Sequence, residues 1–164
     1  MEIVRKCIKY GDNISTDMFV AGRYTKTTDV QEMVSHCMED LDPNYHEKIK
    51  GGAFIVGGEN FGCGSSKEQA AIVAKASGAV GVVAKSFARI FYRNAINLGL
   101  PVIECDTSRI NDGDILVYDS ALGQITNQTT GEVIKFKPLP ENMQKILDAN
   151  GVVNYINTFG TFPR

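Results

Sequence analysis

Three short apolar runs separated by two amphipathic segments constrain the fold of this chain more than any other feature. Residues 53–56, 81–84 and 100–104 have the length and composition of buried strands. Between them, residues 65–77 and 87–97 carry apolar side chains at helical spacing. Strand, helix, strand, helix, strand is the order of a parallel sheet with helical crossovers. The sequence therefore predicts an α/β fold.

The flanking segments extend this sheet. Residues 2–10 alternate apolar and polar side chains, which predicts a half-buried strand before the parallel unit. A helix capped by Thr28 or Asp29 is expected over the apolar face from Val30 to Met38. Three further short strands, a terminal helix and a last apolar segment are expected at residues 114–118, 123–126, 133–136, 141–149 and 152–156. With no repeat or linker in 164 residues, we expect one domain over 1–164, with a central, mostly parallel sheet, flanking helices and an antiparallel C-terminal annex.

The composition limits the partners of the chain. A net charge of -2 and the lack of a basic patch give no electrostatic reason to expect nucleic acid or an anionic membrane. No secretory leader opens the sequence, and no window approaches the ~18–20 apolar residues of a membrane span. A cytoplasmic location is the expectation. The four cysteines, at positions 7, 37, 63 and 105, form no C-x-x-C pair, so a metal or cluster held by this chain alone is not expected.

Residues 57–70 are the part of the sequence most suggestive of chemistry. After the apolar run 53–56, a glycine-rich stretch ends in Gly64-Ser65-Ser66-Lys67, where a helix is expected to open. The spacing fails the dinucleotide fingerprint, because Lys67 stands where the third glycine belongs. It also fails the phosphate-loop pattern, which has a glycine directly before the lysine, whereas Ser66 stands directly before Lys67. Backbone N–H groups, two hydroxyls and a cation at one point nevertheless favour a bound carboxylate or phosphate.

Other interpretations of single residues remain open. Ser65 and Glu68 also fit the S-x-x-E capping box, in which the serine only satisfies backbone donors at a helix start. Arg89 and Arg93, four apart on a helix, could bind an anion or simply be solvated. Cys63 could be a reactive thiol near a helix start or a small side chain chosen for fit.

Three ordered motifs resemble one known family. The segment Gly58-Glu-Asn-Phe-Gly-Cys-Gly-Ser-Ser66 resembles the signature of the swivelling domain of the aconitase superfamily, most closely that of 3-isopropylmalate dehydratase small subunits. Residues 11–17 (Gly-Asp-Asn-Ile-Ser-Thr-Asp) and 85–90 (Lys-Ser-Phe-Ala-Arg-Ile), the latter with Arg93-Asn94 and residues 97–100, agree in the same order. Together the motifs cover about residues 7–105.

The resemblance implies a swivelling β/β/α domain that is one subunit of a hydro-lyase. In that family a separate large subunit carries a [4Fe-4S] cluster, and the pair forms a heterodimer or heterotetramer that acts on a small di- or tricarboxylate. Carried over, Ser65 is the base that removes a proton next to a carboxylate, and Asp17 is an acidic active-site residue. Ser66, Lys67 and Gly64 would bind substrate carboxylate and stabilise the serine alkoxide.

Two lysines stand where the family has arginine, and they bear on the substrate. Lys67 follows the serine pair, and Lys26 lies in the segment Tyr24-Thr-Lys-Thr27, similar to Tyr-Leu-Arg-Thr in isopropylmalate enzymes. Lysine keeps the charge but loses bidentate contact with a carboxylate. We expect an alkylmalate of the 3-isopropylmalate type, with 2,3-dimethylmalate dehydratase or homoaconitase as alternatives. A different class, a non-catalytic anion-binding module, would have no need of the serine pair.

Overall fold

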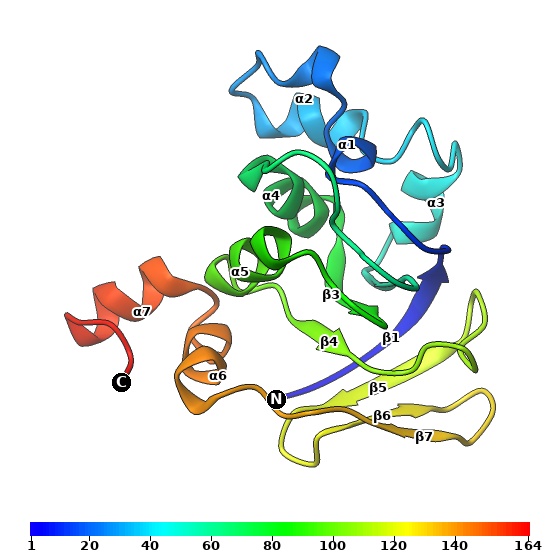
Figure 1. The fold of residues 1–164 in the computed structure, drawn as a ribbon, viewed down its shortest axis with the longest axis vertical. Helices are drawn as coiled ribbons and strands as arrows, with labels where there is room; N and C mark the ends of the chain where they lie inside the picture. Colours follow the sequence, from blue (N-terminus) through cyan, green and yellow to red (C-terminus); the bar gives the residue numbers. More distant parts are fainter.

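The computed structural model describes residues 1–164, which form a seven-stranded curled sheet with helices packed against it (Figure 1). The strand order is β4-β3-β2-β1-β5-β6-β7. The pairs β1–β2, β2–β3 and β3–β4 are parallel, and β1–β5, β5–β6 and β6–β7 are antiparallel. The strands are β1 (Glu2–Lys9), β2 (Ala53–Val56), β3 (Ala79–Ala84), β4 (Val102–Glu104), β5 (Ile115–Asp119), β6 (Gln124–Asn127) and β7 (Val133–Lys135). The antiparallel annex is thus a continuation of the parallel sheet through β1.

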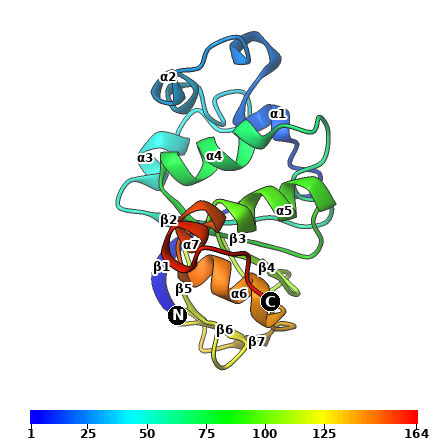
Figure 2. The ribbon, with the colours of Figure 1, turned by 90° about the vertical axis from the view of Figure 1, so that its left-hand side faces the viewer.

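Eight helical segments accompany the sheet. Figure 2 shows the two longest, α4 and α5, side by side over the strands, with α6 and α7 beyond them. The segments are α1 (Thr16–Phe19), the 3₁₀ turn η1 (Gly22–Tyr24), α2 (Val30–Ser35), α3 (Tyr45–Ile49), α4 (Glu68–Ser77), α5 (Arg89–Asn97), α6 (Glu141–Asp148) and α7 (Val152–Phe159). No helix is both long enough and apolar enough to cross a membrane.

The two faces of the parallel strands have different covers. Successive side chains of a strand point to opposite faces. In β2, Ala53 and Ile55 join a core cluster with buried residues of the helices, whereas Phe54 and Val56 join a second cluster with side chains of β5 and β6 such as Leu116. All four β2 residues are buried, as predicted for a continuous apolar strand. The antiparallel strands therefore curl over the face that the helices leave uncovered.

Three local expectations need correction. The helix from Asp29 is shorter than predicted and ends at Ser35, with His36 as its C-cap residue, although Asp29 does cap its start by accepting a bond from the Gln31 N–H at 2.9 Å. The short helix α3 was not anticipated. Helix α4 begins at Glu68 rather than Ser65, and Lys67 is its N-cap residue with no side-chain capping bond, so the capping-box interpretation is wrong.

The fold brings three loops to one edge of the sheet. Register pairs Lys9 with Val56 and Val56 with Val83, so β1, β2 and β3 end side by side. The carboxyl ends of parallel strands are where α/β folds place their ligand sites. The loops that leave this edge contain the glycine–serine motif and both of its companion motifs.

Candidate active site

The loops after β1, β2 and β3 are joined by backbone hydrogen bonds. The Gly62 N–H donates to the Ile14 carbonyl at 2.7 Å, and the Thr16 N–H donates to the Cys63 carbonyl at 2.9 Å. The third loop is tied in where the Phe61 N–H donates to the Ser86 carbonyl at 3.0 Å. Motifs that are about 50 and 25 residues apart in sequence thereby form one surface, with backbone positions fixed by strand-like pairing.

The glycines of the second loop allow close packing between loops. Gly64 has a φ of +94°, and a Cβ there would lie 2.7 Å from Ser15 Oγ. A Cβ at Gly62 would collide with Phe91, and one at Gly58 with the Asp12 carboxylate. Glycine is needed at these positions because another part of the chain occupies the space.

The serine pair lies at the exposed tip of this loop. Gly64, Ser65 and Ser66 are all exposed, and the Thr16 hydroxyl donates to the Ser65 carbonyl at 2.8 Å. That bond holds the Ser65 backbone outside the helix, two residues before the Lys67 N-cap. Both hydroxyls therefore stand free of a capping role, beside the amino end of α4.

Asp17 and Lys67 form an ion pair across the first two loops. The Lys67 ammonium lies 2.6 Å from Asp17 Oδ1 and donates to the Val20 carbonyl at 3.0 Å. The Lys67 side chain is only 15% exposed, while that of Asp17 is 53% exposed. Asp17 is in turn placed by Ser15, whose hydroxyl accepts from the Asp17 N–H at 3.1 Å. Asp17 and Lys67, both predicted from the sequence as site residues, thus form a pair in which Asp17 fixes the position of the Lys67 ammonium.

A cavity of about 380 Å³ opens beside the serine pair. Its walls include Ser65, Ser66 and Lys67 from the second loop and Arg89, the first residue of α5, from the third. Arg89 forms no ion pair with the chain, so its guanidinium adds a positive charge to the cavity wall. Of the two arginines on this helix, the structure places Arg89 at the site and Arg93 outside it. The sequence signals for Arg89 were its spacing of four from Arg93 on a predicted helix and its place in the motif at residues 85–90.

Two predicted site residues do not line this cavity: Asp17, which reaches it only through its ion pair with Lys67, and Lys26. Lys26 is exposed in a turn just after η1, on a segment that is anchored through Glu39. The Glu39 carboxylate accepts from the Tyr24 hydroxyl at 2.9 Å, from Arg23 at 3.0 Å and from His36 at 2.9 Å. Bonding from His36 first, and then from Tyr24, lowers the Glu39 pKa to about 2.

The thiols and acidic groups of the chain do not assemble a metal site. No group of three or more His, Cys, Asp or Glu side chains lies close enough to hold a metal ion. Burial raises the pKa of Cys7 to about 11 and those of Cys37 and Cys105 to about 12, so these three sulfurs stay protonated and are poor ligands and nucleophiles. Cys63 is half-buried beside Ser15, in the pairing between the first two loops.

Comparison with known proteins agrees with this geometry. The family model described as the aconitase C-terminal domain matches residues 5–108, which contain all three loops. The chain belongs to this family. A 3-isopropylmalate dehydratase small subunit from Ruminiclostridium cellulolyticum is 50% identical over 153 residues, covering 92% of this chain and 94% of the relative. The 3-isopropylmalate dehydratase small subunit 2 from Archaeoglobus fulgidus is 48% identical over 161 residues, covering 98% of each chain.

A solved structure carries the same fold. The crystal structure of 3-isopropylmalate dehydratase from Methanocaldococcus jannaschii superposes with a TM-score of 0.91 at 47% identity, covering 96% of this chain and 95% of that one. The fold class and the family resemblance predicted from the motifs are confirmed. Within the family this chain is of the dehydratase small-subunit type, a component of a hydro-lyase.

Proposed function

We propose that this chain is the substrate-binding half of a 3-isopropylmalate-type dehydratase and that Ser65 is its catalytic base. The observation that carries the proposal is the exposed Ser65-Ser66 pair on the wall of a cavity that also includes Lys67 and Arg89. A serine base, hydroxyl donors and two cations at one cavity suit the removal of a proton next to a carboxylate. A module that only bound anions would need the cations but not the serine pair.

The chemistry requires that the Ser65 hydroxyl lose its proton far below its solution pKa. Fixed donors and a nearby cation stabilise the alkoxide when water is excluded. The Lys67 ammonium supplies that charge, and the amino end of α4, which begins at Glu68, adds backbone N–H groups. Ser65 then takes a proton from the carbon next to a substrate carboxylate and returns it in the reverse direction.

The remaining residues hold the substrate. Ser66 and the backbone at Gly64 donate hydrogen bonds to a substrate carboxylate, and Arg89 attracts it to the cavity. Asp17 acts mainly on Lys67: the 2.6 Å ion pair fixes the position of the ammonium and prevents it from swinging to solvent. A substrate with two carboxylates would meet two cationic residues, Lys67 and Arg89, in the lining of the same cavity.

The other half of the site comes from a large subunit. The acidic groups and thiols of this chain do not fit an iron–sulfur cluster. We place the [4Fe-4S] cluster in the large subunit, where it would bind the substrate hydroxyl as a Lewis acid. The complex is a heterodimer or heterotetramer. A cytoplasmic location and the absence of nucleic-acid and membrane partners stay predictions.

The test is anaerobic reconstitution with a large subunit and an assay of alkylmalate dehydration. A panel of 3-isopropylmalate, 2,3-dimethylmalate and homocitrate separates the three substrate alternatives, and we expect the first to be turned over fastest.

Lys26→Arg should change the ratio of kcat/KM values across the panel, because arginine can bind a carboxylate with two hydrogen bonds. Lys50→Arg, at an exposed lysine just after α3, is the matched control. Equal ratios for wild type and Lys26→Arg would remove Lys26 from the specificity assignment.

A further inference from the structure

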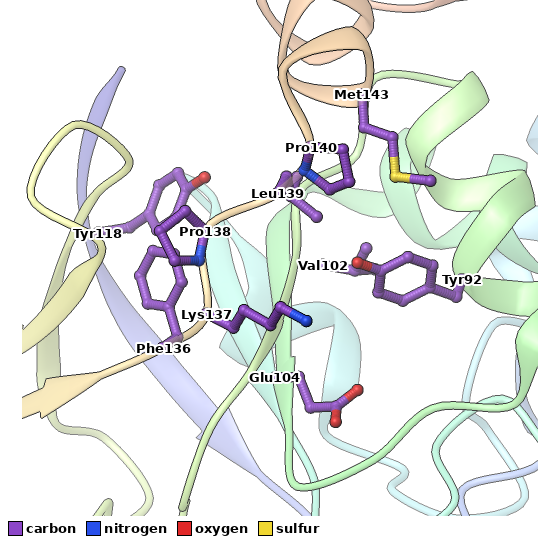
Figure 3. Close-up of a pocket in the computed structure, with 10 residues that line it drawn as sticks. All are labelled: Tyr92, Val102, Glu104, Tyr118, Phe136, Lys137, Pro138, Leu139, Pro140 and Met143. Carbon is purple, nitrogen blue, oxygen red and sulfur yellow. The ribbon is translucent and has the colours of Figure 1, made fainter.

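A second cavity, larger than the serine cavity, lies away from the serine site. It has a volume of about 590 Å³ and is bounded by α5, α6, the end strand β4 and residues 136–140, which follow β7 (Figure 3). Apolar and aromatic side chains form most of its wall, among them Val102, Leu139 and Met143. In Figure 3 the Lys137 side chain reaches into the opening between Tyr92 and Glu104.

This cavity is connected to the serine site by a third hollow. A cavity of about 330 Å³ along α5 shares Tyr92, Glu104 and Met143 with the 590 Å³ cavity. It also contains Arg89, which lines the serine cavity at its other end. The three hollows therefore form one line on the surface, here called the α5 groove, from the serine pair to residues 136–140.

The charges of the α5 groove are unbalanced. Arg89, Arg93 and Lys137 face a single carboxylate, Glu104, and none of the four forms an ion pair. The chain as a whole has a net charge of -2, so this stretch is a local positive region on a negative protein. Positive side chains around apolar hollows complement a partner with acidic and apolar residues.

The border of the groove suits an extended occupant. β4 is an end strand of the sheet, so one of its edges has backbone N–H and C=O groups that no strand pairs. An extended peptide can bind such an edge by backbone hydrogen bonds while its alternate side chains enter neighbouring pockets. A compact small molecule would fill one hollow and leave the continuity of all three unused.

We propose that the α5 groove is the docking site of an extended segment of the large subunit, with acidic side chains opposite Arg93 and Lys137 and apolar side chains between Val102 and Met143. The inference rests on the proposed function, because it takes a large subunit as the partner. The groove starts at the cavity that this subunit must cover to complete the active site. One bound segment would thus extend the shared active site into an anchoring contact.

Charge reversal tests the groove without touching the serine cavity. The dissociation constant of the complex with the large subunit would be measured by titration calorimetry for Arg93→Glu, Lys137→Glu and the double variant. We expect each single change to weaken binding about tenfold and the double change about a hundredfold, with wild-type affinity falling as salt is raised. Arg109→Glu, which reverses a 75% exposed arginine outside the groove, should stay within about twofold.

The outcomes separate the groove from the function. At saturating large subunit, Arg93→Glu should retain the wild-type kcat, since Arg93 does not line the serine cavity. Unchanged affinity in the double variant would overturn the groove while leaving the dehydratase assignment intact. Failure of wild type to bind any large subunit would instead overturn the function. If the variants change only the self-association of this chain in sedimentation, a second copy is the occupant and the proposal is wrong.

Folding is checked by thermal melting of each variant alone. If a reversal lowers the melting temperature, Arg93→Gln and Lys137→Gln replace it, because they remove charge without introducing repulsion. The double glutamine variant should still weaken binding by several-fold. Wild-type affinity in that variant would contradict the proposal.

Discussion

The parallel and antiparallel halves of the sheet use their loops differently. In the parallel half, β1, β2 and β3 end at one edge, and their loops place Thr16, Ser65 and Arg89 around one cavity although the residues are far apart in sequence. In the antiparallel half, each strand returns beside its neighbour, and side-chain bonds join nearby residues, as where the Asn127 amide donates to Asp114 at 2.7 Å.

The difference shows that the residues of the site and many residues that stabilise the fold come from different halves of the sheet. Parallel connections must cross the sheet, so successive loops accumulate at the same edge and can share a ligand. The antiparallel strands instead supply buried side chains such as Leu116, Tyr118 and Ile125, which cover the second face of β2 and β3. Changes in the parallel half should therefore affect turnover, and comparable changes in the antiparallel half should affect stability at most.

The largest effect is expected at the serine pair. Ser65→Ala in the reconstituted complex should lower kcat by about 10²–10⁴-fold, the range for loss of a general base, with little change in melting temperature. Ser120→Ala, at the end of β5, is the antiparallel counterpart and should leave kcat unchanged. Steady-state kinetics measure both. Turnover by Ser65→Ala at the wild-type rate would make the base assignment wrong.

Two glycines with positive φ provide the next comparison. Gly64→Ala places a Cβ 2.7 Å from Ser15 Oγ at a φ of +94° and should displace the serine loop, reducing kcat/KM at least about tenfold. Gly131→Ala, at a φ of +82° in the turn between β6 and β7, meets no atom within 4 Å. It should cost only the backbone strain, about 1 kcal/mol, with activity intact. Steady-state kinetics and urea unfolding distinguish the two variants. Equal losses of kcat/KM in both would mean that backbone strain, and not the contact with Ser15, causes the effect at Gly64.

The two ion pairs between distant residues should differ in a similar way. Asp17→Asn frees the Lys67 ammonium from its 2.6 Å partner, so we expect KM to rise several-fold as the cation loses its fixed position. Glu132→Gln removes the 3.4 Å pair with Arg109 in the antiparallel half, where 75% exposure of the arginine makes the pair worth little. It should change neither KM nor stability. If Asp17→Asn behaved like Glu132→Gln, Asp17 would have no part in placing Lys67.

The smallest effect is a pH-dependent change in stability. The Glu39 pKa is lowered from 4.5 to about 2, so its bonds to His36 and Tyr24 stabilise the fold above about pH 4.5 and are lost as pH falls toward 2. Glu39→Gln should therefore unfold at lower urea than wild type at pH 7, with the difference shrinking below pH 4.5. Glu141→Gln, which loses bonding from Lys145 alone, should show a smaller shift of the same sign. A constant difference across pH would contradict this account of Glu39.

Most of the fold could be predicted from the sequence because its signals are local. Continuous apolar runs such as 53–56 mark strands buried on both faces, and helical spacing marks α4 and α5 between them. The five-residue helix α3 gave no comparable signal. The start of α4 was misplaced because a distant residue decides it: the Thr16 hydroxyl bonds the Ser65 carbonyl and holds it out of the helix.

The site was predictable as a set of residues but not as an arrangement. The motifs pointed to Ser65, Lys67 and Asp17, yet the ion pair between the last two depends on loops that meet only after the parallel sheet forms. The spacing of Arg89 and Arg93 could not distinguish the two arginines, and only the position of Arg89 on the cavity wall identifies it as the one at the site. For Lys26 the opposite holds. The family motif indicated a part in substrate specificity, but the structure does not place this residue at the cavity.

The central claim is that this chain is half of an active site, and one titration tests it most directly. Increasing amounts of the chain are added to a fixed amount of reconstituted large subunit, and the rate of 3-isopropylmalate dehydration is followed. The account predicts no turnover by either subunit alone and a rate that rises to a plateau at a fixed ratio of subunits. Turnover by this chain alone, or a large-subunit rate that does not respond to it, would contradict the claim.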